Sequence, residues 1–469
     1  MTTLYRPELL YTGDRFLPNA GLLVDDDGRI AGIVSSGTPQ PIPETCTVID
    51  LPGKALLPGF VNTHSHSFQR LIRGKSESRA TSGKDFWSWR GTMYHAAAQL
   101  TPEQIYDVAR MAFLEMALAG IATVGEFHYL HTDPGGRPYD DPNLLGKQVI
   151  AAAQSVGIRI VLLRAAYFRS GFQLPRDPGQ TRFFESLPDY LRNTALLRAA
   201  FPNSADVRIA VAPHSIRAVG LNDLREIAAF SRSAGVPLHM HVSEQTAENE
   251  ACIREYGTTP VTLLANAHLL ASGWSAIHAI HITGDEMCLL AEADVGVCAC
   301  PGTERNLGDG IFCADRVMQH GIPVALGSDS QAQIDPLEDA RQLDYHLRLK
   351  CQQRAILDQI DGQPLVQRLF ACATRNGARA LGVPAGDLQP GNSADFFTVD
   401  RRDLSIAGHS AGDLLPLIVF GLNRSAIRDV CVNGKLLVRD GQHPLREEII
   451  GRYADTHAAI WRDTLGSAT

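Results

Sequence analysis

The central part of the chain alternates between short apolar runs and longer segments with a helical period. Eight runs have the length and composition of buried strands: 59–66, 123–130, 159–167, 207–215, 237–244, 276–282, 294–301 and 323–330. Eight segments have a helical pattern: 102–119, 143–156, 184–200, 221–234, 258–271, 284–293, 313–320 and 336–350. Eight strand and helix pairs over about 270 residues predict a (β/α)8 TIM barrel, with a doubly wound open sheet as the alternative.

Both ends of the chain have β-strand patterns instead. Near the N-terminus, runs at 21–24 and 30–34 flank an Asp-Gly pair, which is a hairpin turn signal. Near the C-terminus, runs at 427–432 and 435–438 flank Asn433-Gly434, a pair that accepts the positive φ of a type I′ turn. A further strand is expected at 394–399. Both ends of the chain are thus β-rich.

Composition excludes several classes of protein. Hydrophobic residues make up 45% of the 469 residues and charged residues 20%, which excludes a disordered chain, a collagen-like repeat and a coiled coil. The formal charge of −8 makes the chain a poor candidate for binding nucleic acid or an anionic membrane, and we expect neither partner. The sequence has no Walker A motif and no G-x-G-x-x-G after a strand, so nucleotide-cofactor chemistry lacks support.

The spacing of the cysteines and the hydropathy of the chain predict its cellular compartment. The nine cysteines are scattered and lack paired spacing, which is typical of a reduced chain rather than a disulfide framework. The first 16 residues contain charges where a signal peptide needs an apolar run, and no stretch approaches the roughly 18 apolar residues of a membrane span. We therefore expect a cytoplasmic protein.

Metal-ligand side chains recur at the ends of the predicted barrel strands. His64 and His66 close the first strand, where residues i and i+2 face the same side. His241 ends the fifth strand and Asp329 the eighth, and barrel enzymes carry their chemistry at this end of the strands. Three imidazoles and one carboxylate suit a divalent ion of the zinc or iron type.

Two more polar residues lie near the same predicted strand ends. Glu244 follows His241 by three residues, so its carboxylate could carry a proton between water and a leaving nitrogen; the alternative is a surface carboxylate. His278, in the sixth strand, is expected to polarise the attacking water, with a core histidine as the alternative.

The segments PGFVNTHSH and HVSE, the sixth-strand His and the eighth-strand SD resemble the metal-dependent amidohydrolase superfamily over essentially the whole chain. The resemblance implies that His64, His66, His241 and Asp329 bind the metal, and that Asp329 also accepts the proton of the attacking water. It implies a small β-sandwich formed by residues 1–58 and 384–469, the latter with a C-terminal helix, beside a barrel domain at 59–383. Binuclear members carry a carboxylated Lys on the fourth strand, and none stands at 207–215. One metal per chain, as in the deaminase branch, is therefore implied, most simply Zn²⁺ with Fe²⁺ as the alternative.

Seven further segments resemble the formimidoylglutamate deiminase family: 63–74, 85–94, 125–131, 212–219, 241–245, 300–312 and 326–331. Gly302 and Arg305 depart from the family pattern. The resemblance implies hydrolysis of N-formimino-L-glutamate to N-formyl-L-glutamate and ammonia in histidine degradation. It also implies a substrate-binding set: Gln69, Arg90, Tyr129, His214 and Arg217.

The arginines in this set suit a small anionic substrate. A carboxylate that leaves water needs hydrogen-bonding or charged partners, and Arg can bind it with two hydrogen bonds. A nucleobase or adenosine-type deaminase, or a chlorohydrolase, is the alternative within the superfamily, and Trp87 and Trp89 could stack on such a ring. A catalytically inactive scaffold and a binding protein for acidic amino acids are alternatives from other classes. We expect a homodimer, the commonest symmetric assembly.

Overall fold

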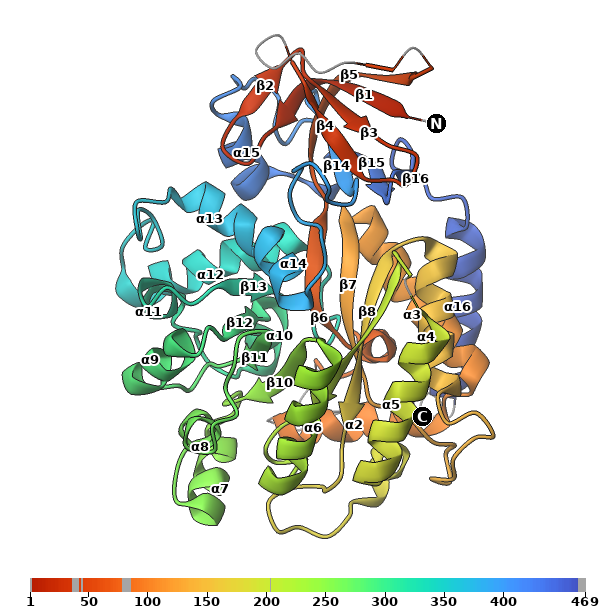
Figure 1. Cartoon of the computed structure of the whole chain (residues 1–469), viewed down its shortest axis with the longest axis vertical. Helices are drawn as coiled ribbons and strands as arrows, with labels where there is room; N and C mark the ends of the chain where they lie inside the picture. The colour runs from red at the N-terminus through yellow and green to blue at the C-terminus, as the bar shows by residue number, and fades with distance from the viewer. Residues whose placement is uncertain (1, 36–41, 44, 78–85, 203, 463–469) are drawn as a thin grey trace, which may run out of the picture.

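The computed structural model describes residues 2–35, 42–43, 45–77, 86–202 and 204–462, with the backbone alone at 86–88. Eight parallel strands pair in chain order to form the central sheet (Figure 1). They are β6 (Phe60–Ser65), β7 (Ile121–His128), β8 (Arg159–Ala166), β9 (Val207–Pro213), β10 (Leu238–Val242), β11 (Trp274–His278), β12 (Gly296–Ala299) and β13 (Val324–Leu326). A parallel bridge between Ser65 and Asp329 joins the last strand to the first, so the sheet is a barrel and not the open alternative.

Each predicted helical segment contains a helix on the outside of this barrel. The helices are α3 (Pro102–Leu118), α4 (Leu144–Val156), α5 (Leu187–Ala200), α6 (Leu221–Ala234), α8 (Pro260–Asn266), α9 (Gly284–Glu292), α11 (Ala314–Gln319) and α12 (Pro336–Cys351). Local signals explain several boundaries. Thr101 and Thr283 form capping boxes at the starts of α3 and α9, and Gly157 ends α4 in the left-handed conformation.

Several shorter elements lack a counterpart in the sequence prediction. They are η1 (Ser67–Ile72), α2 (Phe86–Gln99), η2 (Pro178–Phe183), α7 (Thr246–Tyr256), α10 (Pro301–Leu307), α13 (Leu365–Cys372), α14 (Arg375–Leu381), α15 (Leu414–Gly421) and η3 (Arg424–Ala426). Five of them, η1, α2, η2, α7 and α10, lie after the carboxyl ends of barrel strands, where they surround the site described below. The sixth strand was predicted at 276–282 but ends at His278, because His278 and Ala279 have φ values of 71° and 51° that interrupt an extended chain.

The two ends of the chain build the expected small β domain, which lies above the barrel in Figure 1. Its strands are β1 (Thr3–Tyr11), β2 (Phe16–Pro18), β3 (Gly21–Val24), β4 (Ile30–Val34), β5 (Thr47–Pro58), β14 (Phe396–Asp400), β15 (Ile427–Val432) and β16 (Lys435–Val438). They form one continuous sheet in the order β16-β15-β14-β5-β1-β3-β4, with β2 paired to β1. The predicted hairpin at Asn433-Gly434 is confirmed, with φ values of 48° and 73° at the turn. The domain boundaries at 58/59 and 383/384 stay predictions.

Contacts fix this domain and the C-terminal helix to the barrel. Arg159, at the start of β8, is fully buried and forms an ion pair with Asp395. The C-terminal helix α16 (Arg446–Trp461) packs along α3, where Glu448 receives two hydrogen bonds of 2.8 and 2.7 Å from Arg110. Both ends of the chain therefore contribute to the scaffold that supports the barrel.

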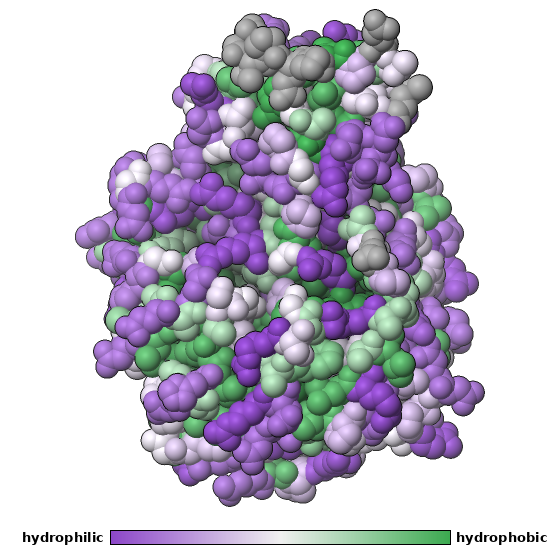
Figure 2. Space-filling view, in the orientation of Figure 1, coloured by the Kyte–Doolittle hydropathy of each residue, from purple (hydrophilic) through white to green (hydrophobic). Residues whose placement is uncertain are grey.

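The surface of the described chain has mixed polarity, and its cysteines are unpaired. Polar residues are distributed over the face shown in Figure 2, with smaller apolar areas between them. Among the described residues, no helix combines the length and apolar character needed to cross a bilayer. All nine cysteines are free thiols.

Candidate active site

Four predicted metal ligands meet at the carboxyl end of the barrel. His64 and His66 come from β6 and the residue after it, His241 from β10, and Asp329 from the segment after β13. One ligand atom from each lies within 4.8 Å of the others, and all four side chains are buried. The strand ends therefore bring together residues that are 265 positions apart in the sequence (64 to 329).

Hydrogen bonds orient two of these imidazoles toward a common point. Nδ1 of His66 lies 2.8 Å from the carbonyl oxygen of Phe127, and Nδ1 of His241 lies 2.9 Å from that of His214. A carbonyl only accepts, so each Nδ1 carries the hydrogen and each Nε2 presents a lone pair. Nε2 of His241 lies 3.2 Å from Nε2 of His64. Converging lone pairs in a buried space fit a cation.

Burial keeps these rings in the neutral form that binds metals. It lowers the pKa of His66 to about 3 and places the pKa of His64 and His241 below the usual range. Three neutral imidazoles and a carboxylate are the donor set expected for a divalent ion of the zinc or iron type. The residues present therefore fit a metal.

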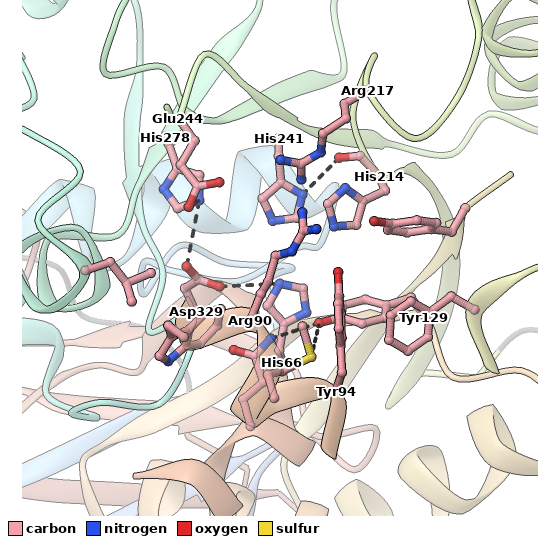
Figure 3. A pocket seen from close by; sticks show the side chains of 16 residues that line it. His66, Arg90, Tyr94, Tyr129, His214, Arg217, His241, Glu244, His278 and Asp329 are labelled. Carbon is pink, nitrogen blue, oxygen red and sulfur yellow. Dashed lines mark hydrogen bonds and ion pairs between the residues drawn. The ribbon is translucent and has the colours of Figure 1, made fainter. Parts of the chain in front are cut away.

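Asp329 divides its two oxygens between the imidazole cluster and the neighbouring histidine. Oδ1 lies 3.3 Å from Nε2 of both His64 and His66, whereas Oδ2 lies 3.7 Å from Nε2 of His278 (Figure 3). Burial alone would raise the pKa of Asp329, but these three histidines outweigh it and lower the pKa below the usual range. The backbone of Asp329 is strained, with φ of 46°. Two residues earlier, Gly327 passes so close to His64 that a Cβ would lie 2.8 Å from the histidine Cβ.

Glu244 and His278 lie beside Asp329, as the sequence predicted. Oε1 of Glu244 is 3.7 Å from Nε2 of His278, and both side chains are buried. Burial raises the pKa of Glu244 to about 7. Burial opposes the charged form of His278, but the carboxylates of Glu244, Glu304 and Asp329 raise its pKa well above the usual value. A carboxyl group that changes protonation near neutral pH is suited to proton transfer.

The five predicted substrate-binding residues line one cavity with this cluster (Figure 3). The cavity contains about 490 Å³ of empty space, part of it open to solvent. Its lining includes Gln69, Arg90, Tyr129, His214, Arg217, His66, His241, Glu244, His278 and Asp329. Gln69 and Tyr129 are joined by a hydrogen bond of 2.9 Å from Nε2 to the hydroxyl oxygen. His64 lies behind the lining and completes the ligand set. The guanidinium groups of Arg90 and Arg217 point into the cavity (Figure 3).

Sequence reasoning missed several residues of this cavity. Tyr94 and Tyr167 face it, and Gln180 Nε2 donates hydrogen bonds of 2.6 and 2.9 Å to their hydroxyl oxygens. Met93, Phe183 and Leu307 add apolar surface. Tyr94 ends the matched segment 85–94, which was a usable signal, whereas Tyr167 and Gln180 lie in no matched segment.

Four further residues singled out in the sequence differ in their relation to this cavity. Trp89 lines the cavity, but the side chain of Trp87 lies outside the described residues. Gly302 donates its backbone N–H to Asp339, and Arg305 is exposed and paired with Glu338 at 3.2 Å. Neither Gly302 nor Arg305 lines the cavity.

Known proteins resemble this chain over most of its length. The amidohydrolase family model matches residues 55–437. A formimidoylglutamate deiminase from Pseudomonas aeruginosa is 36% identical over 83% of this chain and 86% of its own length. An 8-oxoguanine deaminase from the same organism is 29% identical over 94% of each chain. The crystal structure of an amidohydrolase from Brucella melitensis superposes with a TM-score of 0.89 at 32% identity, covering 98% of this chain and 99% of that one. The chain therefore belongs to the amidohydrolase family, and it is a hydrolase that acts on C–N bonds.

Proposed function

We propose that the protein hydrolyses N-formimino-L-glutamate to N-formyl-L-glutamate and ammonia, with one Zn²⁺ per chain or Fe²⁺ in its place. The observation that carries this proposal is the pairing of two arginines with the metal-ligand cluster in a single cavity. The relative from P. aeruginosa that is 36% identical is a formimidoylglutamate deiminase, which supports the same substrate.

The cavity wall can satisfy a substrate with two carboxylates. Arg90 and Arg217 supply two guanidinium groups, and the burial of Arg217 gives its hydrogen bonds to an anion more weight than they have in water. Tyr94 and Tyr167 each accept from Gln180 and also form a hydrogen bond with each other, so one hydroxyl hydrogen remains to be donated to a ligand. A dianionic substrate thus finds charge and hydrogen-bond donors on the side of the cavity that the metal ligands do not occupy.

His64, His66, His241 and Asp329 would hold the ion. A bound divalent ion lowers the pKa of water to about 7 and polarises the group under attack. Oδ2 of Asp329 faces His278, and so it can accept the proton of the attacking water while Oδ1 faces the ligand cluster. His278 Nε2, which lies 3.7 Å from both Asp329 and Glu244, directs that water toward the formimino carbon.

Glu244 completes the proton balance. Water adds its oxygen to the formimino carbon, the C–NH₂ bond of the adduct breaks, and the nitrogen leaves as ammonia. The departing nitrogen needs a proton, and a carboxyl with a pKa of about 7 holds one at neutral pH and can release it. Glu244 is buried and faces this space, so its proton is delivered inside the cavity.

Deletion analogues of the substrate test the proposal. Ammonia release is measured for N-formimino-L-glutamate, for N-formimino-4-aminobutyrate, which lacks the α-carboxylate, and for N-formiminoglycine, which lacks the side-chain carboxylate. We expect kcat/KM to fall at least about tenfold for each lost carboxylate, since hydrogen bonds to charged groups contribute about 1.5–3 kcal/mol. Equal kcat/KM for the three compounds, or no ammonia from any of them, would contradict the proposal.

A nucleobase or adenosine-type deaminase is the second candidate. Trp89 in the cavity lining could stack on a base, and the relative with 29% identity is an 8-oxoguanine deaminase. The same ammonia assay with 8-oxoguanine, guanine, cytosine and adenosine separates the two candidates. The cytoplasmic location and the homodimer stay predictions.

A further inference from the structure

We propose that Glu304 is the positioning residue of the active site: it fixes the ring orientation of His278 so that Nε2 faces the reacting atoms. Nδ1 of His278 lies 3.2 Å from Oε1 of Glu304, and the two side chains are 1% and 3% exposed. The opposite ring nitrogen, Nε2, is buried, makes no hydrogen bond among the described residues, and faces Glu244 and Asp329.

The backbone around His278 does not hold the ring by itself. His278 and Ala279 have φ values of 71° and 51°, which are costly for residues with a Cβ, so tertiary contacts must maintain this conformation. The N–H of Ala279 donates to the carbonyl of Val242 at 3.0 Å, which anchors the main chain. Glu304 is the described residue that makes a hydrogen bond to the ring itself.

The same carboxylate oxygen also determines which ring nitrogen faces the cavity. Oε1 of Glu304 accepts the backbone N–H of Cys300 at 2.8 Å, at the start of α10. A carboxylate oxygen only accepts, so Nδ1 of His278 must donate to it. Nε2 is therefore the ring nitrogen on the cavity side, where it can form a hydrogen bond with the attacking water.

Two substitutions at position 304 separate this role from simple packing. In Glu304→Gln, the backbone N–H of Cys300 can only donate, so the amide oxygen is expected to occupy the Oε1 position. There it can still accept a hydrogen bond from Nδ1 of His278. In Glu304→Ala the acceptor is lost. We expect Glu304→Ala to lower kcat about 10- to 100-fold, with KM within about twofold, and Glu304→Gln to retain kcat within a fewfold.

Asp339→Ala is the matched control. Asp339 is also buried and accepts the backbone N–H of Gly302 at 2.9 Å, so it supports the same end of α10, but it does not line the cavity. We expect Asp339→Ala to lower the melting temperature and leave kcat within about twofold. A loss of kcat equal to that of Glu304→Ala would show that helix support explains both variants, and would overturn the proposal.

The proposal rests on the proposed function only for its kinetic measurement, which can use any compound from which the enzyme releases ammonia. Crystal structures of the metal-loaded wild type, Glu304→Ala and Glu304→Gln provide a second readout that needs no substrate. We expect the His278 ring to rotate or to occupy several orientations in Glu304→Ala and to keep its place in Glu304→Gln. An unmoved, single ring orientation in Glu304→Ala, or a kcat for Glu304→Gln about 100-fold below wild type, would overturn the assignment. If the ring moves as expected but the enzyme does not turn over N-formimino-L-glutamate, the proposed substrate is contradicted and the role of Glu304 is not.

Discussion

Oδ2 of Asp329 lies 3.7 Å from Nε2 of His278, although the two residues come from different barrel strands. The other carboxylate oxygen, Oδ1, faces His64 and His66 at 3.3 Å. One carboxylate therefore joins the metal-ligand cluster to the residues proposed to move protons. This arrangement is compatible with the proposal that Asp329 acts both as a ligand and as an acceptor of the water proton, which the following predictions test.

Replacing Glu244 by Gln removes the proton that the departing nitrogen needs while keeping the size of the side chain. Because general acid–base catalysis contributes about 10²- to 10⁴-fold, we expect kcat to fall by that range. The ligand set is unchanged, so metal content measured by emission spectrometry should stay near that of the wild type. Retained kcat in a variant with normal metal content would contradict the role of Glu244.

Replacing Arg217 by Met removes one buried cation from the cavity wall while keeping an apolar stem. We expect KM for N-formimino-L-glutamate to rise about 10- to 100-fold, in line with the energy of a hydrogen bond to a charged group. Arg305→Met is the control, because Arg305 is exposed and lies outside the cavity lining. An equal effect of the two substitutions on KM, measured by ammonia release, would argue against carboxylate binding by Arg217.

Metal removal should lower stability through the ligand cluster. An ion that binds only the folded chain stabilises it by mass action, so a chelator is expected to lower the melting temperature of the wild type by several degrees. His241→Ala removes one ligand, and its melting temperature should respond less to the chelator. Calorimetry with and without chelator checks this, and an equal response of wild type and variant would exclude His241 as a ligand.

Acid should weaken the fold through a buried ion pair away from the cavity. Glu185 accepts hydrogen bonds of 2.6 and 2.8 Å from Arg164 and lies 3.7 Å from His131. Despite burial, which acts in the other direction, these cations lower the pKa of Glu185 from 4.5 to about 2. The pKa of Glu185 is thus lower in the folded chain than in the unfolded chain. The stabilisation is full above pH 4.5 and is lost as pH falls toward 2, and it amounts to about 2–3 kcal/mol.

Urea unfolding of Glu185→Gln at several pH values measures this contribution. We expect the difference in free energy of unfolding between wild type and variant to be large at pH 7 and to shrink below pH 4.5. Glu226→Gln, at an exposed position on α6, serves as the control and should show no such trend. A difference that does not depend on pH would contradict the linkage.

Much of the fold could be predicted because the apolar runs of the barrel strands and the helical period of the segments between them are both clear in the sequence. Each predicted barrel strand and helix overlaps one in the structure, since the strands are rich in apolar residues and almost entirely buried, and most of the helices have a clear buried side. The unpredicted helix α7 buries only Glu248 and Cys252, so its sequence contains almost no hydrophobic period. The seven-residue helix α10 is too short to show one.

The candidate site could be predicted where a residue's position on a strand determines its location. His64, His66, His241 and Asp329 follow strand ends, and the barrel brings such ends together. Gln180 and Tyr167 could not be predicted, because Gln180 lies in the η2 segment and meets Tyr94 and Tyr167 only through the folded loops. Glu304 is buried on the short helix α10, and the sequence prediction did not include this helix.

The comparison of two substrates on one metal-analysed preparation tests the central claim most directly. Ammonia release would be measured as kcat/KM for N-formimino-L-glutamate and for 8-oxoguanine, with the metal content of the same sample determined. The two arginines and the metal-ligand cluster in one cavity predict a kcat/KM at least about 10³-fold higher for N-formimino-L-glutamate, the discrimination that buried polar groups left unpaired by the wrong substrate can produce. A kcat/KM that is higher for 8-oxoguanine in a metal-loaded sample would contradict the account.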